Sequence, residues 1–338
     1  MAVITEKELK QQIKSGSFAN LYVFFGDESY LKNYYVSRIC EKAVAKDFYD
    51  FNMHKFDGKN TAVDDIVDAV EAVPMMSEYS CIIVKDYPLD TVSNNEFEKL
   101  VSLVSDLPET SVLIIYFDNT TPDRRKGGKF SNILNIAQNK GAVCELNKLS
   151  IPQLQKILTS GAQKRGCSIE YSECVYFINS VGDDLNLLLN ELDKLCFYVK
   201  DGKITKADID EVCIKSVEAR VFDLSKALIS NNCDKAFSVI DTLFLQKTEP
   251  VIIAGVLISA YVDMYRAKLA VLAGERAENV SKYFNYKNKE FRLRNAAKDA
   301  SRLTVTQLKL CLEELSNADE LLKGSGFDSR LVLEQCMS

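Results

Sequence analysis

The sequence predicts an α/β domain built on a parallel sheet, followed by two all-helical domains. Up to about residue 146, five short apolar segments alternate with helical patterns, which is typical of a parallel sheet covered by helices on both faces. Beyond residue 150 the patterns are helical throughout. The prolines agree with this division, because four of the six precede residue 130 and only Pro250, in a position suited to the first turn of a helix, lies beyond 152.

The elements of the first part follow in order. Thr5 and Glu8 are spaced as a capping box, which opens a first short helix. The continuously apolar run 21–25 predicts a buried strand that ends at Gly26. Further strands are expected at 51–56, 81–85, 112–117 and 142–146, with helices at 29–46, 63–73, 95–104 and 130–138. Together they predict an α/β domain over residues 1–148.

Two helical domains are expected after it. Helical patterns at 151–165, 171–180, 185–199 and 206–213 predict a small domain over residues 149–213, of a size that still folds independently. A second helical domain, 214–338, is expected from the patterns at 221–230, 233–245, 250–273, 289–300, 306–323 and 328–335.

Composition excludes several classes of protein. The 338 residues are enough for two or three domains. With 47% apolar and 27% charged residues, the chain is neither disordered nor fibrous. There are 48 acidic and 42 basic residues, a net charge of −6, which argues against nucleic-acid binding by the charge of the whole protein but leaves room for a local basic patch.

Cysteine and histidine usage predicts no metal centre and no cofactor. The ten cysteines form no CxxC pair, and free cysteine packs as a small apolar side chain, so we expect reduced core thiols and a cytoplasmic protein. His54, the single histidine, is expected on a strand, and one histidine excludes a His-based triad or a multi-His metal site. The start of the chain lacks a leader pattern, and the apolar run 250–262 is shorter than the roughly 20 residues of a membrane span.

A damaged phosphate-binding motif follows the first strand. Gly26 and Lys32 match the first glycine and the lysine of GxxxxGK[ST], the loop between a strand and a helix that cradles phosphates. Leu31 replaces the second glycine, and Asn33 replaces the hydroxyl residue that binds Mg²⁺. The alternative is an ordinary strand–turn–helix connection whose Gly–Lys spacing is coincidental. Both interpretations exclude ATP hydrolysis.

Two further nucleotide-contacting motifs are degraded. Asp86 follows the third predicted strand one position too late for a Walker B aspartate, so a structural strand is the better interpretation. The segment 182–186 resembles the lid motif of AAA+ proteins, but Asn186 stands near the place of its phosphate-sensing arginine. The combination indicates an AAA+-like body without catalysis, followed by a small helical lid and a helical C-terminal domain, which the resemblance described next implies to be the oligomeric collar.

In order and spacing, three stretches resemble the delta-subunit family of the bacterial DNA polymerase III clamp loader. These are the opening strand with its glycine–acidic–leucine turn, 21–31, the entry into the last domain, 217–224, and the closing helix, 318–324. The resemblance implies a subunit that opens the ring-shaped sliding clamp (beta) for loading onto primed DNA without hydrolysing ATP. The implied partners are the ATP-hydrolysing gamma/tau subunits, the delta-prime subunit and primer–template DNA, within a DNA-directed DNA polymerase (nucleotidyltransferase) holoenzyme and without a membrane.

The resemblance also implies where the clamp binds. The family's clamp-binding element is a pair of large apolar residues just after the helix that follows the second strand, which corresponds here to Met75 and Met76, preceded by Val73 and Pro74. Pro74 disfavours helical geometry at Val73 and is expected to end the helix there. Methionine adapts to irregular pockets at binding surfaces. The alternative is that both methionines pack into their own domain.

A basic segment offers a second contact. Arg124, Arg125, Lys126 and Lys129 flank two glycines, so a mobile loop that contacts DNA phosphates is one interpretation and a solvated surface loop is the other.

For the whole chain, the competing functions are an active AAA+ ATPase with an atypical P-loop and an unrelated α/β–helical scaffold protein.

Overall fold

The computed structural model describes residues 4–120, 122, 128–199, 201–286, 290–324 and 326–337. The chain divides into two compact units, Met1–Leu149 and Ser150–Ser338. The second unit contains both regions for which the sequence predicts separate domains, and the lid–collar boundary at residues 213 and 214 stays a prediction.

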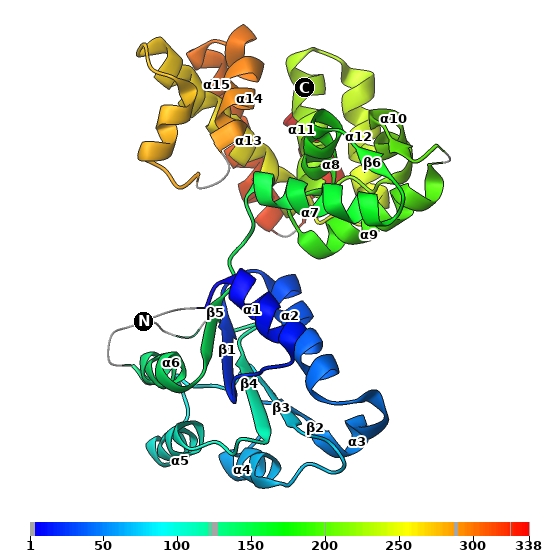
Figure 1. The fold of residues 1–338 in the computed structure, drawn as a ribbon. Helices are drawn as coiled ribbons and strands as arrows, with labels where there is room; N and C mark the ends of the chain where they lie inside the picture. The colour runs from blue at the N-terminus through cyan, green and yellow to red at the C-terminus, as the bar shows by residue number, and fades with distance from the viewer. Residues whose placement is uncertain are drawn as a thin grey trace. The chain divides into compact units, whose positions relative to one another are not determined.

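Five parallel strands form the sheet of the first unit (Figure 1). They are β1 (Leu21–Phe25), β2 (Met53–Asp57), β3 (Ser80–Lys85), β4 (Ser111–Tyr116) and β5 (Ala142–Glu145). Their order is β2-β3-β4-β1-β5, so β1 is paired on both sides, with Tyr22 opposite Ile114 of β4 and Ala142 of β5. In open parallel sheets, ligands bind beyond the carboxyl ends of the strands where the strand order reverses. The turn after β1 therefore occupies the place where such a sheet would hold a nucleotide.

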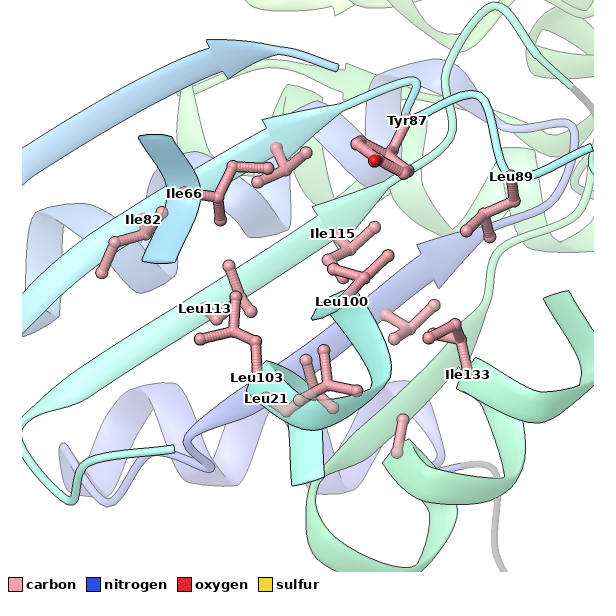
Figure 2. Close-up of a cluster of buried hydrophobic side chains, with 14 of the residues drawn as sticks. Leu21, Ile66, Ile82, Tyr87, Leu89, Leu100, Leu103, Leu113, Ile115 and Ile133 are labelled. Atoms are coloured by element: carbon pink, nitrogen blue, oxygen red, sulfur yellow. The ribbon is translucent and has the colours of Figure 1, made fainter. Parts of the chain in front are cut away.

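Helices cover both faces of this sheet, as Figure 1 shows. They are α1 (Glu6–Ser15), α2 (Ser29–Ala43), η1 (Lys46–Phe48), α3 (Tyr49–Asn52), α4 (Val63–Glu71), α5 (Asn94–Ser105) and α6 (Lys129–Lys140). Helices α4, α5 and α6 enclose one apolar core, in which Ile66 and Leu100 meet Leu113 of the sheet (Figure 2). Helix α2 packs on the opposite face through buried Tyr35 and Ile39. Because both faces are covered, β1 is buried along its whole length, which explains its unbroken apolar sequence.

The predicted fold class and order of elements are confirmed, but some boundaries were wrong. The strand predicted at 51–56 begins only at Met53, because the residues before it form the short helix α3. Helix α2 ends at Ala43, three residues before its predicted end, where Val44 turns to an extended conformation. His54 lies on β2 as expected.

Within its described residues, the second unit is helical apart from β6 (Ser168–Ile169) and β7 (Lys203–Ile204), a pair too short for the sequence to indicate. Its first helices are α7 (Ile151–Lys164), α8 (Tyr171–Val181), α9 (Leu185–Tyr198) and α10 (Lys206–Val212). The helices that follow are α11 (Val217–Ile229), α12 (Cys233–Leu245), α13 (Pro250–Leu272), η2 (Ala277–Lys282), α14 (Glu290–Asp299), η3 (Ala300–Arg302), α15 (Val305–Lys323) and α16 (Ser329–Gln335).

Helix α13 is long and apolar enough to cross a membrane, but it packs as the central helix of the second unit. Leu257 and Met264 are buried in the core that it shares with α11, α14, α15 and α16. Asp263, in the middle of the helix, is also buried and pairs with Arg292 of α14 at 3.0 Å. A carboxylate paired inside a protein core is typical of a folded domain, and membrane insertion would expose it to lipid. The predicted buried helix at this position is therefore confirmed.

The ten cysteines are free thiols, and six of them are buried. Among the described residues, no group of three or more His, Cys, Asp or Glu side chains could hold a metal ion.

Candidate functional site

The loop between α4 and β3, residues 72–79, exposes an unusual amount of apolar surface. Val73, Met75 and Met76 are 89%, 51% and 76% exposed. The helix before the loop ends at Glu71, so the predicted end at Val73 was wrong by two residues, because Ala72 is already extended with ψ 130°. Pro74 therefore lies three residues beyond the last helical residue and does not mark the end of the helix.

A buried side chain fixes the backbone of this loop. Asn52, the last residue of α3, is completely buried. Its Nδ2 donates to the carbonyl oxygen of Met75 at 2.9 Å, and its Oδ1 accepts the N–H of Met75 at 2.7 Å. One amide group thus satisfies both backbone polar groups of Met75, and Asn52 acts as a positioning residue for the loop.

The next residue, Met76, has a left-handed backbone with φ +51°. This conformation is uncommon for a residue with a side chain, and it persists only where neighbouring contacts hold it. The Asn52 bonds supply such a contact one residue earlier. The loop therefore displays its apolar side chains from a defined backbone rather than from a loose connection.

Loss of the Asn52 amide should free the loop. In Asn52→Ala, the part-buried N–H and carbonyl of Met75 lose their partners, at a cost of about 1 kcal/mol. Hydrogen-exchange protection of the Met75 amide should then fall severalfold. Asn20→Ala is the matched control, because Asn20 holds a different loop through the carbonyls of Pro108 and Glu109. Equal protection of Met75 in both variants would show that Asn52 does not position it.

The turn after β1 is built for tight packing against β5. Gly26 has φ +107°, and a Cβ there would lie 2.4 Å from the carbonyl oxygen of Leu146. The same carbonyl accepts the N–H of Glu28 at 2.9 Å. Glu28 is buried and is the N-cap of α2, which begins at Ser29. The chain thus passes from strand to helix within three residues.

Lys32, at the position of the phosphate-binding lysine, is turned into the protein. It is 1% exposed, and its Nζ donates to the carbonyl oxygens of Gly26 at 2.7 Å and Phe117 at 2.6 Å. Asp118 Oδ1 lies 3.8 Å from the same nitrogen. Burial lowers the pKa of Lys32 and outweighs the attraction of Asp118. The amine therefore joins the ends of β1 and β4 instead of facing a nucleotide.

Asp86, after β3, is also engaged by its own domain. Its carboxylate accepts the backbone N–H groups of Asp118, Asn119 and Thr120 at 2.7–3.2 Å. Burial alone would raise the pKa of Asp86, but these donors outweigh it and hold the pKa below its usual range. Lys85 pairs with Asp118 Oδ2 at 2.8 Å. Asp86 therefore shapes the loop after β4 and does not present its carboxylate for Mg²⁺, in agreement with the structural interpretation.

The remaining residues of the degraded motif take structural positions. Leu31 is buried in the first unit. Asn33 Nδ2 donates to the carbonyl oxygen of Ser29 at 2.9 Å, one helical turn back, and lies 3.5 Å from Asp118 Oδ2. Asn186 is an exposed residue of α9 in the second unit. An amide in place of the arginine cannot supply a positive charge to a phosphate.

We expect the purified chain not to bind ATP. Lys32 donates its hydrogen bonds to backbone carbonyls, and the Asp86 carboxylate accepts the backbone N–H of Asp118. Glu28 adds a negative charge beside the turn. Titration with a fluorescent ATP analogue, up to about 1 mM and with Mg²⁺ present, should give no saturable signal. A dissociation constant above about 1 mM corresponds to a binding free energy weaker than about 4 kcal/mol. Saturable binding or ATP turnover would contradict this assignment.

The structure describes one residue of the predicted DNA-contacting set. Lys129 begins α6, and its Nζ donates to the carbonyl oxygen of Val92 and lies 5.6 Å from the ring centre of Phe97. This amine therefore contacts its own domain. Arg124, Arg125 and Lys126 lie outside the described residues.

Comparison with known proteins places the chain in a family. The family described as "DNA polymerase III, delta subunit" matches residues 22–146, and the family of that subunit's C-terminal domain matches residues 218–338. The chain belongs to the DNA polymerase III delta-subunit family. The first match contains the β1 turn, Lys32 and the loop 72–79. The interval 147–217, which includes most of the predicted lid, lies between the two matches.

Full-length relatives agree with this membership. DNA polymerase III subunit delta of Bacillus subtilis is 24% identical over 334 residues, which cover 96% of this chain and 93% of the relative. The probable DNA polymerase III subunit delta of Aquifex aeolicus is 21% identical over 311 residues, covering 89% and 86%. The solved DNA clamp loader delta protein of Bacillus subtilis shares the fold over 98% of both chains, with a TM-score of 0.62 at 22% identity. Over nearly its whole length, the chain is therefore similar to delta subunits of DNA polymerase III.

Asn52 is a residue of this candidate site that the sequence did not reveal. It lies 23 residues before Met75, at the end of a four-residue helix that overlaps the segment predicted as a strand. An asparagine at such a place has no local signature, because its role depends on a contact made only after folding.

Proposed function

We propose that this subunit binds the sliding clamp through the loop 72–79 and opens the ring for loading onto primed DNA. The observation that carries the proposal is the pair Met75 and Met76, exposed on a backbone that Asn52 holds in place. A preorganised apolar element loses less conformational freedom on binding than a mobile one. Its side chains suit a hydrophobic pocket on the partner.

Opening follows from differential affinity. If the loop and its surroundings bind the open ring more tightly than the closed ring, binding shifts the population of the clamp toward the open state. This step needs no nucleotide on the subunit itself. Lys32 and Asp86 agree with this, because both form hydrogen bonds within their own domain. ATP hydrolysis then belongs to the gamma/tau subunits of the complex.

The proposal includes the rest of the assembly. The partners are the beta clamp, the gamma/tau and delta-prime subunits and primer–template DNA, in the cytoplasm. The helices from α11 onward form the collar that joins the subunits, and residues 149–213 form the lid. The basic segment that includes Arg124, Arg125 and Lys126 is the proposed contact with DNA phosphates.

Clamp opening can be measured with this chain alone. The labelled cognate clamp is placed on a nicked circular plasmid, the purified subunit is added without ATP, and the clamp that remains on DNA is separated by gel filtration. We expect release of the clamp well above its spontaneous rate. If the subunit binds the clamp but leaves it on the circle, the opening step is wrong and only the docking assignment stands.

A further inference from the structure

Two thiols of the first unit lie against each other in its interior. Cys40 of α2 and Cys81 of β3 have their Sγ atoms 2.8 Å apart, and both residues are buried. A disulfide has an S–S bond of about 2.0 Å, so the two sulfurs are within about 0.8 Å of bonding distance. They belong to elements that already pack together, so bonding requires no large movement of the backbone.

A pocket lies next to this pair. It has a volume of about 500 Å³ and lies beside α2, β2 and β3. Cys40 is part of its lining, together with Val36, Tyr49, Met53 and Ile83. Cys81 is not a lining residue, but it is the neighbour across the sheet of Met53 of β2, which is one. Cys40 is therefore a lining residue of the pocket with an exposed fraction of 2%, and Cys81 is its fully buried neighbour in the core.

We propose that Cys40 and Cys81 form a modification site, a dithiol that hydrogen peroxide entering this pocket converts to a disulfide. The Cys40 sulfur attacks one oxygen of the peroxide, and the O–O bond breaks. The other oxygen departs as water with the thiol proton, and Cys40 becomes a sulfenic acid. The Cys81 sulfur then attacks the Cys40 sulfur, the S–O bond breaks, and the Cys81 proton leaves with the second water. Two thiols are oxidised, and one peroxide is reduced to two waters.

The environment of the pair assigns the two roles. The hydrogen bond with Cys40 and burial both raise the pKa of Cys81, so Cys81 stays protonated as the resolving thiol. Cys40, which borders the pocket, is the thiol that meets the oxidant. The 41-residue separation of the two cysteines contains β2, α4 and the loop 72–79. The disulfide would thus close a covalent ring of which the loop 72–79 is a part, whatever the loop binds.

The test uses the full chain treated with hydrogen peroxide. Digestion without reductant, followed by mass spectrometry, should yield a peptide that joins Cys40 to Cys81 and is two hydrogens lighter than the two peptides together. Oxidation should raise the melting temperature of the first unit by roughly 5–10 °C, through the reduced freedom of the unfolded chain. Dithiothreitol should reverse the shift.

Matched variants identify the pair. Cys40→Ser and Cys81→Ser should lose the oxidation-dependent shift, and Cys144→Ser, which replaces another buried cysteine of the same unit, should keep it. The exposed Cys233 reports that the oxidant has acted. If Cys40 and Cys81 remain free thiols in wild type when Cys233 is oxidised, or if Cys40 is oxidised without a link to Cys81, the proposal fails. The wild-type peptide map decides even if a serine variant does not fold.

Discussion

Replacing Met75 and Met76 by alanine should weaken binding of the cognate sliding clamp by about 10²- to 10⁴-fold. Each methionine, if fully buried at the interface, contributes about 1.5–3 kcal/mol, and tenfold in affinity corresponds to about 1.4 kcal/mol. The loss should appear as a faster dissociation rate in surface plasmon resonance, as for most changes at the centre of an interface.

The loop itself should survive this double change. Asn52 holds Met75 through its backbone N–H and carbonyl, which alanine retains. Phe197→Ala is the control, because Phe197 is a 92% exposed apolar residue of α9 in the other unit. Unchanged circular dichroism is required of both variants. A folded double variant that still binds as wild type would move the clamp contact away from this loop.

Lys32→Met should destabilise the first unit by about 3–5 kcal/mol, the usual cost of removing one partner from a buried charged network. The carbonyl oxygens of Gly26 and Phe117 would lose their donor, and Asp118 would lose Lys32 but keep its ion pair with Lys85. Urea unfolding followed by circular dichroism should show an early transition for this unit.

Lys85→Met is the comparison for this experiment. Lys85 pairs with the same Asp118, but its side chain is 36% exposed, and such pairs contribute about 1 kcal/mol or less. The two variants should therefore differ clearly in their unfolding midpoints. Equal midpoints would mean that the buried amine of Lys32 does not stabilise the domain, and a nucleotide-binding role would have to be reconsidered.

The sheet could be predicted because its physical signal is local. β1 and β4 are buried along their whole length, so β1 is an unbroken apolar run in the sequence and β4 is one after its first residue, Ser111. The capping box at Thr5 and Glu8 is likewise a pattern within four residues, and it begins α1 where predicted. The family resemblance then supplied the function that no local pattern contains.

The arrangement of the site could not be predicted, because its contacts join distant parts of the chain. Lys32 has the spacing of a phosphate-binding lysine, but its partner Phe117 is 85 residues away. Asn52 and Met75 are 23 residues apart, and the helix that carries Asn52 overlaps a predicted strand. In both cases a buried polar group found its partner through tertiary packing, which overrides local preference.

The central claim, that the loop 72–79 meets the clamp, is tested most directly by photo-crosslinking. A photoreactive phenylalanine analogue is placed at Met76 or, as a control, at Phe197, in the full chain mixed with the cognate clamp. We predict a covalent product with the clamp from position 76 and none from position 197, with the crosslink mapped to an apolar pocket of the clamp. A crosslink from position 197 alone, or from neither position under conditions where the proteins bind, would contradict the account.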